Sequence, residues 1–240
     1  MVTDDEIDKI IDYLNKIGNS VRSVGNRMLS VSDIAKIRSK TGEFGQKYDA
    51  KLILADVCLA WRNQYKKKVI PRVLSIKERY SSIKTLEQLQ GTMESLGDRF
   101  NKEFWDFNSP RRKQMFSELI AEFIQYKGKM LIENDLEAMR HWARNAVLED
   151  YKKGINGKPV TCLGIANYQY LRMLCGINTV KPDTHILRGV KDALGYETRP
   201  FQVVKLIEIT SHHMGTSALE IDQLLWVYYT DEVPEIGWNE

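Results

Sequence analysis

The sequence has few cysteines, and they are not arranged for cross-linking. Its 240 residues include only Cys58, Cys162 and Cys175, an odd number with no Cys-x-x-Cys pair. Cys58 and Cys175 lie in apolar stretches, where a free cysteine packs as a small hydrophobic residue. This pattern argues against a disulfide framework and against a metal cluster built from cysteine alone, and it suits a reducing cytoplasm.

Long apolar runs are also missing. None approaches the roughly 20 residues that a membrane-spanning helix needs. The first ten residues, MVTDDEIDKI, are acidic and amphipathic, and they lack the basic and apolar regions of a secretory signal. We therefore expect a cytoplasmic protein with no membrane partner.

Two further patterns are absent. No stretch shows the sustained apolar–polar alternation of a half-buried strand. The histidines have no carboxylates at a helical ligand spacing such as HExxH, so solvated or packed side chains are expected and no metal site; they are His141, His185, His212 and His213.

Helical spacing and helix start signals are what the sequence does contain. Thr3 with Glu6, Thr85 with Gln88, and Ser217 with Glu220 form capping boxes, and Ser109-Pro110 is typical of a helix start. The run Leu52–Trp61 is apolar almost all round and predicts a buried helix, while residues 18–30, rich in Gly, Asn and Ser, predict a loop. One further helix is expected from about Ser32 to Arg38, and another begins at Pro71. The remaining expected helices span residues 134–151, 164–175, 184–194 and 201–213. The sequence therefore predicts an all-α fold with about ten helices.

The charge balance permits a nucleic acid partner without requiring one. Lysine and arginine number 35 against 32 acidic residues, which gives a net charge of +3. The basic runs Lys66–Lys68 and Arg111–Lys113 are candidates for phosphate contacts, although such runs are more often simply solvated.

A turn followed by a helix predicts an anion site near residue 160. Asn156–Pro159 turns the chain, Gly164 can take a backbone conformation closed to alanine, and Ile165–Leu174 is the helix. A tight turn that leads into a helix exposes backbone N–H groups, which bind phosphate without a particular side chain. The alternative is that Gly157 and Gly164 are ordinary helix breakers.

Asp183 is the candidate catalytic carboxylate. Pro182 disfavours a helical Lys181, so the helix 184–194 is expected to start at Asp183. Asp183 is then either only the N-cap, or also a rigidly held carboxylate that faces a cleft and stabilises positive charge on a sugar ring. The two roles are compatible, because one oxygen can cap while the other meets substrate.

These residues resemble the helix-hairpin-helix base-excision DNA glycosylases, the endonuclease III-like superfamily. That family has Leu-Pro-Gly-Val-Gly, a helix near Thr-Ala-Asn, a glycine, then Val-Asp-Thr-His. Ile165-Ala166-Asn167, Gly176 and Pro182-Asp183-Thr184-His185 match the later parts, with the family interval between Gly176 and Asp183. The likeness covers about residues 48–195 in order, and only 160–190 is specific.

The departures from the family pattern shape what the resemblance implies. Val160-Thr161 replaces Leu-Pro, and Cys162 stands at the first glycine of the hairpin. Ile165 and Ala166 stand where bifunctional members carry the Schiff-base lysine, and no cysteine follows Cys175. The resemblance therefore implies a monofunctional glycosylase without an iron–sulfur cluster or other cofactor.

By the same resemblance, Asp183 is the catalytic residue, and the hairpin 158–164 holds duplex DNA through phosphate. The hairpin residues are Lys158, Thr161, Gly164 and Ile165. The resemblance places base-flipping or pocket residues at Trp61, Arg62, Asn63, Gln64 and Tyr168. The alternative for Trp61–Gln64 is a solvated helix end, and for Tyr168 it is core packing.

The predicted architecture is a two-lobed, glycosylase-like monomer. Residues 1–47 with 190–240 form a terminal lobe, and residues 48–189 form a helical barrel lobe with the hairpin 158–164 and the Asp segment 181–185. A second hypothesis is a non-catalytic helix-hairpin-helix module that binds DNA or a partner. A third, an unrelated helical protein, predicts no hairpin at 158–164.

Overall fold

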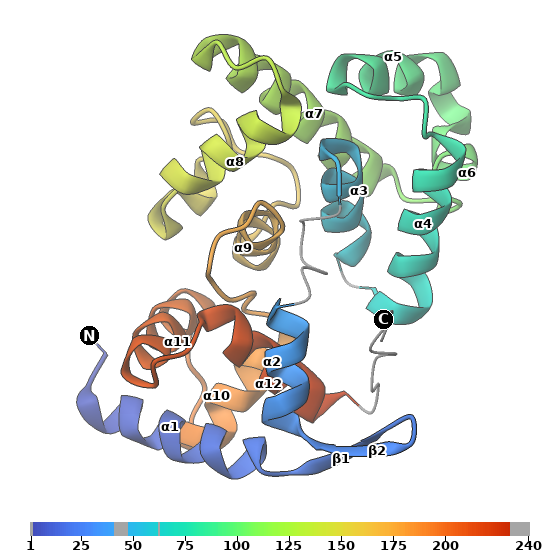
Figure 1. Cartoon of the computed structure of the whole chain (residues 1–240). Coiled ribbons are helices and arrows are strands. Elements are labelled where there is room, and N and C mark those ends of the chain that lie inside the picture. Colours follow the sequence, from blue (N-terminus) through green and yellow to red (C-terminus); the bar gives the residue numbers. More distant parts are fainter. Residues whose placement is uncertain (1, 41–47, 62, 231–240) are drawn as a thin grey trace. The chain divides into compact units, whose positions relative to one another are not determined.

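The computed structural model describes residues 2–40, 48–61 and 63–230, and it confirms the predicted all-α fold (Figure 1). The described residues form helices α1 to α12, short 3-10 and π-helical segments, and one two-stranded hairpin. The chain divides into two compact units, Met1–Phe44 with Asn178–Glu240, and Gly45–Ile177. Within the described ranges, no helix has the length and apolar character that crossing a membrane requires.

The boundary between the units differs from the predicted one at residue 190. It lies at Ile177/Asn178, so the segment 181–185 belongs to the terminal unit rather than to the inserted one. The reason is that side chains of the last two helices hold this segment, as described below. The N-terminal boundary at Phe44/Gly45 lies close to the predicted position.

The terminal unit is built around its last helix. Its elements are α1 (Asp4–Gly18), β1 (Val21–Val24), β2 (Arg27–Ser30), α2 (Val31–Lys40), α10 (Thr184–Leu194), α11 (Pro200–His213) and α12 (Ala218–Tyr229). Helix α12 contacts α1, α2, α10 and α11, and it lies beside α2 in Figure 1. Gly189 of α10 allows the close approach to α12, because a Cβ there would lie 2.4 Å from Leu225 Cδ2.

The prediction of a loop over residues 18–30 was wrong in part. β1 and β2 pair antiparallel, with Val24 opposite Arg27 and the residues Gly25-Asn26 as the connection. Gly25 has φ 58°, which a two-residue hairpin loop of the primed type requires. The helix that follows is capped by Ser30, whose Oγ accepts from Asp33 N at 3.0 Å, and not by Ser32.

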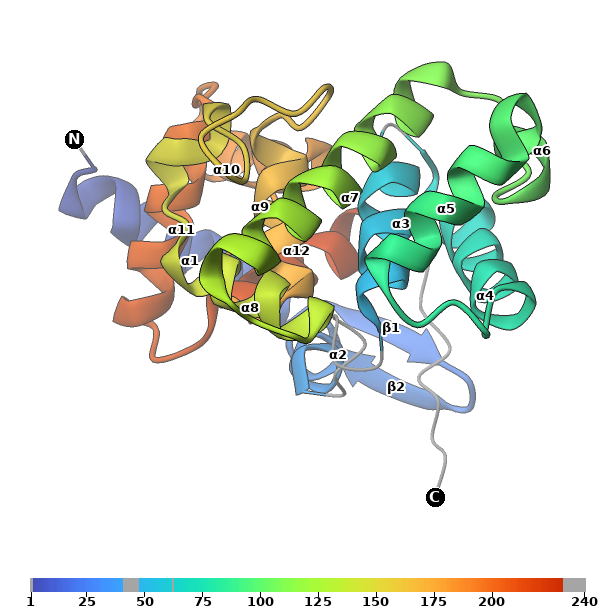
Figure 2. The ribbon, with the colours of Figure 1, turned by 90° about the horizontal axis from the view of Figure 1, so that it is seen from above.

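The inserted unit surrounds the buried helix α3. Its elements are α3 (Ala50–Ala60), the π-helix Tyr65–Val69, α4 (Ile70–Arg79), α5 (Leu86–Leu96), the 3-10 helix Gly97–Arg99, α6 (Phe100–Glu103), α7 (Pro110–Met130), α8 (Asp135–Asn145), the 3-10 helix Leu148–Lys152 and α9 (Ile165–Leu174). Every residue of α3 is buried, as its apolar sequence predicts. Helix α7 packs against α3, α5 and α8 (Figure 2).

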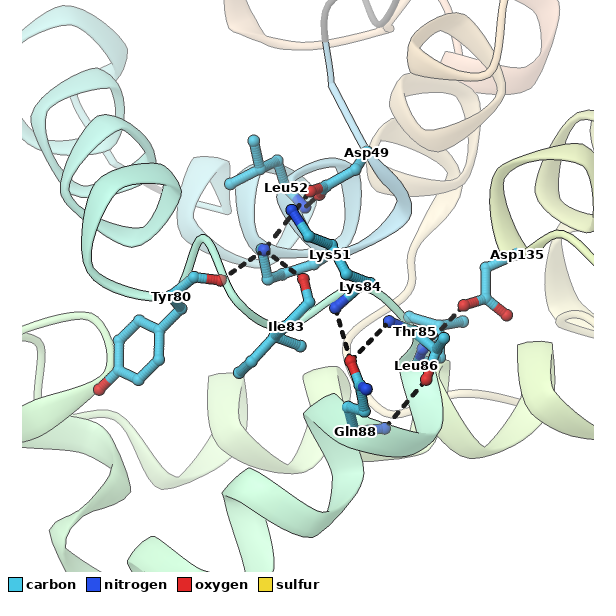
Figure 3. A network of polar contacts seen from close by, with 10 residues as sticks. All are labelled: Asp49, Lys51, Leu52, Tyr80, Ile83, Lys84, Thr85, Leu86, Gln88 and Asp135. Atoms are coloured by element: carbon cyan, nitrogen blue, oxygen red, sulfur yellow. Dashed lines mark hydrogen bonds and ion pairs between the residues drawn. The ribbon is translucent and has the colours of Figure 1, made fainter.

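A buried lysine anchors the connection between α4 and α5 (Figure 3). Lys51 Nζ donates to the carbonyl oxygens of Tyr80 at 2.8 Å and Ile83 at 2.9 Å, and it pairs with Asp49 at 3.4 Å. These bonds satisfy backbone groups that have no helical partner. Lys51 therefore stabilises the fold, with its amine engaged by three oxygens.

Candidate functional site

Asp183 begins α10, as the sequence predicts. Its Oδ1 accepts hydrogen bonds from the backbone N–H groups of His185 at 2.9 Å and Ile186 at 3.3 Å. Its backbone is extended, with φ −89° and ψ −173°, and its own N–H donates to Lys181 O at 2.7 Å. The carboxylate is thus fixed by both its side chain and its backbone.

The second oxygen of Asp183 has a different environment. Oδ2 accepts no hydrogen bond from any residue that the structure describes, and the residue is half-buried. A carboxylate held by one oxygen can direct the other at a positive charge without reorganising. Capping and chemistry are therefore geometrically compatible at this residue.

A second carboxylate, Asp222 of α12, holds the segment that leads into Asp183. Its Oδ1 accepts the Lys181 N–H at 3.0 Å, and its Oδ2 accepts from Gln223 Nε2 at 3.0 Å. Burial raises the pKa of Asp222 to about 7, and the negative charge of Asp183 adds to the rise. The hydrogen bond from the Lys181 N–H and the positive charge of Lys181 lower the pKa of Asp222, and the hydrogen bond from the Gln223 amide lowers it by a smaller amount. Sequence patterns give no sign of this residue.

In the inserted unit, residues 160–163 form a turn, which lies inside the predicted hairpin 158–164 and after the turn predicted at Asn156–Pro159. Leu163 N donates to Val160 O at 3.2 Å, and Cys162 has φ 60°. A turn closed between its first and fourth residues, with a positive φ only at the third, is of type II. Glycine is the usual residue at that position of a type II turn, so Cys162 adopts a backbone conformation that glycine normally takes.

Gly164 does not have the special conformation expected of it. Its φ of −72° and ψ of 173° are extended and open to any residue. It is the N-cap of α9, no side chain caps that helix, and a Cβ built on Gly164 would meet nothing within 4 Å. The first amides of α9, from Ile165 on, have no intrahelical acceptor.

Thr161 is not available as a phosphate donor. Its N–H donates to Glu118 Oε2 at 2.6 Å and its hydroxyl to Glu118 Oε1 at 3.0 Å. Both donors are therefore used by a carboxylate of α7, which corrects the predicted role. Lys158 is 76% exposed and lies 3.4 Å from Glu122 Oε1, so its amine can still reach solvent ions.

The residues predicted for base flipping differ in availability. Trp61 is half-buried beneath the Arg112 guanidinium, 5.3 Å from its ring centre. Asn63 Nδ2 donates back to Leu59 O at 2.8 Å, whereas Gln64 is exposed and its side chain caps no helix. Arg62 lies outside the described residues. Gln64 is thus the best placed of the described candidates to enter a base stack.

Tyr168 belongs to the core and not to a base pocket. Its side chain is 0% exposed, its hydroxyl donates to Val147 O at 3.1 Å, and its ring meets Trp142 edge-on at 5.5 Å. A ring enclosed on all sides cannot stack on a base. Arg112 of the basic run 111–113 is likewise buried, and it donates to Cys58 O at 3.1 Å and to Trp61 O.

A buried polar cluster was missed in the sequence. Asp56 of α3 is 0% exposed and accepts from Tyr65 Oη at 2.8 Å and Tyr170 Oη at 3.0 Å. Burial, and next the Asp56 charge, raise the pKa of both phenols well above the usual range. The available signal was a single acid in the otherwise apolar run Leu52–Trp61. The cluster joins α3, the π-helix and α9.

No three His, Cys, Asp or Glu side chains in the described ranges are grouped as a metal site would require. The sequence model of a family described as a domain of unknown function (DUF8548) matches residues 88–230, more than half of the chain. The chain therefore belongs to this family. No curated protein and no solved structure shows a significant match to it.

Proposed function

We propose that this member of the DUF8548 family is a monofunctional DNA N-glycosylase that flips a damaged or mismatched base out of duplex DNA and excises it. We also propose that the chain has the helix-hairpin-helix glycosylase fold and acts as a monomer in the cytoplasm. The observation that carries the proposal is that the two oxygens of Asp183 differ. Oδ1 caps α10, whereas Oδ2 accepts no hydrogen bond from any described residue. The type II turn at 160–163 supports it independently.

Asp183 acts on the sugar in this proposal. As the bond between C1′ and the base nitrogen breaks, its electron pair leaves with the base, and positive charge develops on C1′ and the ring oxygen. The Asp183 carboxylate stabilises that charge and orients a water molecule. The water oxygen then bonds to C1′, and a water proton ends on the departing base.

The start of α9 holds the DNA backbone. Amides without an intrahelical acceptor, together with the helix dipole, attract a phosphate, and Gly164 offers no Cβ to block its approach. Lys158 is exposed at the same turn. Ile165 and Ala166 open this helix, so no amine attacks the sugar and no Schiff base forms.

A second candidate function is a non-catalytic DNA-binding or interaction module on the same scaffold. The observation that favours it is Glu118, whose carboxylate binds both donors of Thr161. A fixed negative charge beside the turn repels phosphate and weakens the family mode of binding.

A base-release panel distinguishes the two. Duplexes carrying uracil, an oxidised purine, an alkylated purine or a G·T mismatch are incubated with wild-type protein and with Asp183→Asn. We expect wild-type protein to release at least one base, leaving an abasic site that is cut only after alkali, and borohydride to trap no covalent complex. Binding without release from any duplex would favour the second function.

A further inference from the structure

The segment between α9 and α10 depends on side chains for its order. Residues 178–182 form no helix or strand, so their backbone groups need other partners. Asn178 Oδ1 accepts the Leu219 N–H at 3.2 Å, and Thr179 Oγ1 donates to Glu208 at 2.7 Å. The contact nearest to Asp183 is the one between Lys181 N–H and Asp222, two residues before the candidate catalytic carboxylate.

Asp222 is itself fixed in orientation. Gln223 Nε2 donates to Asp222 Oδ2, and Gln223 Oε1 accepts from Arg38 Nε at 2.7 Å. An arginine can only donate, so Arg38 sets which end of the Gln223 amide points toward Asp222. The three side chains are buried, and Asp222 is 7% exposed. The network thus presents Asp222 as an acceptor to the Lys181 N–H.

A carboxylate is a costly choice for this purpose. Burying a charge is unfavourable unless it is well paired, and a neutral amide oxygen would accept the same hydrogen bond at lower cost. Either acceptor, a carboxylate or a neutral amide oxygen, supplies the partner that the Lys181 N–H lacks in a helix or strand, and so restrains the backbone at this position. The rigidity passes directly onward, since Lys181 O accepts the N–H of Asp183 at 2.7 Å.

We propose that Asp222 is a positioning residue for Asp183, which fixes the Lys181–Asp183 backbone so that Oδ2 of Asp183 keeps a single direction. The inference rests on the proposed function for its chemical meaning. The structural part of the inference, that a rigid start of α10 depends on Asp222, does not require the proposed function. Asp222 touches no substrate in this proposal and acts only through the Lys181 N–H.

Amide hydrogen exchange tests the structural content without any substrate. We compare wild-type protein with Asp222→Ala, which removes the acceptor, and with Asp222→Asn, which keeps one oxygen for the Lys181 N–H and loses the hydrogen bond from Gln223 Nε2. Glu220→Ala is the matched control, because it removes an acid from the same helix and the Glu220 side chain does not form the reciprocal capping bond. Asp222→Ala should lower the protection of the Lys181 and Asp183 amides by about tenfold or more, with Asp222→Asn and Glu220→Ala close to wild type.

Single-turnover base release tests the chemical content. Asp222→Ala should slow release on the order of 10-fold to 100-fold through misplacement of Asp183, with DNA affinity within about twofold of wild type. Asp222→Asn should recover most of the rate. Should Asp222→Ala not fold, Asp222→Leu takes its place, because it fills the same space without an acceptor; native Lys181 protection in that variant overturns the proposal.

Two further results overturn it. One is native protection at Lys181 and Asp183 in folded Asp222→Ala, and the other is an unchanged release rate in that variant despite lost protection. If wild-type protein releases no base from any duplex, the glycosylase proposal fails. The exchange measurement then still decides whether Asp222 orders the start of α10.

Discussion

At the scale of single residues, Asp183 caps α10 and is the residue to which we assign the proposed chemistry. Asparagine caps helices about as well as aspartate, whereas alanine costs about 1 kcal/mol at an N-cap. We therefore expect Asp183→Asn to keep the wild-type free energy of unfolding and Asp183→Ala to lose about that amount. Urea denaturation followed by circular dichroism measures both. A loss in Asp183→Asn as large as that in Asp183→Ala would show that the charge, and not the capping oxygen, stabilises the fold.

The second residue-scale prediction concerns Asp222 and pH. The raised pKa of about 7 means that folded protein binds this proton more tightly than the unfolded chain, where an aspartate has a pKa of about 3.9. Asp222 therefore contributes on the order of 4 kcal/mol to the free energy of unfolding below about pH 4. This contribution is lost as the pH rises toward 7. The charged neighbours in this balance are Asp183, Lys181 and, through Gln223, Arg38.

Asp222→Asn should remove that dependence. The free energy of unfolding of wild-type protein, measured relative to Asp222→Asn by denaturation between pH 4 and pH 8, should fall with rising pH and level off above about pH 7. Carboxylates whose pKa is lowered, such as Glu6 and Glu87, act in the opposite direction but equally in both proteins. A constant difference across this range would show that Asp222 titrates normally.

The sequence could reveal Asp183 but not its partners. The N-cap follows from Pro182 and the apolar periodicity after it, which are local features. Asp222 meets Lys181 across 41 positions, and Glu118 meets Thr161 across 43. No spacing rule links residues so far apart, so the pairing of Thr161 with a carboxylate and the buried Asp222 network emerge only from the fold.

At the scale of elements, the turn 160–163 makes the sharpest prediction. A β-branched residue at a positive φ is strained, by about 1–3 kcal/mol, whereas glycine adopts that φ freely. Cys162→Val should lose about that much stability, and Cys162→Gly should stay within about 1 kcal/mol of wild type. Thermal denaturation compares them, with Gly164→Ala as a control at an extended position with open space. Equal stability of the Val and Gly variants would argue against the positive φ at Cys162.

Helix starts and ends were predictable where their signals are local. Thr3, Thr85, Ser109 and Ser217 cap helices as predicted, and the reciprocal bond of the predicted capping boxes forms at Thr3 and Thr85 but not at Ser217. The β1–β2 hairpin was not predicted, because its strands are four residues long and show no sustained alternation. Its one local signal was Gly25-Asn26 between two short β-compatible stretches. The π-helix Tyr65–Val69 has no comparable sequence signal.

At the scale of the whole molecule, the net charge is only +3, so the proposed DNA binding would depend on clusters of basic residues. Lys66–Lys68 are exposed beside the candidate base-flipping segment. Replacing all three by alanine should weaken duplex binding and reduce the slope of log affinity against log salt by about 1 to 3. Fluorescence anisotropy across a salt series measures the slope.

The matched control for this experiment is the triple alanine variant of Lys77, Lys84 and Lys129, which are exposed lysines of the same unit. It removes the same charge at other places. Equal effects of the two triple variants would show that binding follows net charge and that Lys66–Lys68 have no special position.

The division of the chain was predictable at one boundary only. The boundary predicted between residues 47 and 48 lies close to the observed one at Phe44/Gly45. The second boundary, Ile177/Asn178, was not predicted, because residues 178–183 join the terminal unit through contacts with α11 and α12. The order of elements along the chain does not determine which unit a connecting segment packs against.

The most direct test of the central claim is single-turnover base release by wild-type protein and Asp183→Asn on one duplex, with binding measured in parallel. The duplex is the one from which wild-type protein releases its base fastest. We predict equal DNA affinity for the two proteins and loss of release in Asp183→Asn. Release by Asp183→Asn at the wild-type rate, or no release by wild-type protein from any duplex, would contradict the account.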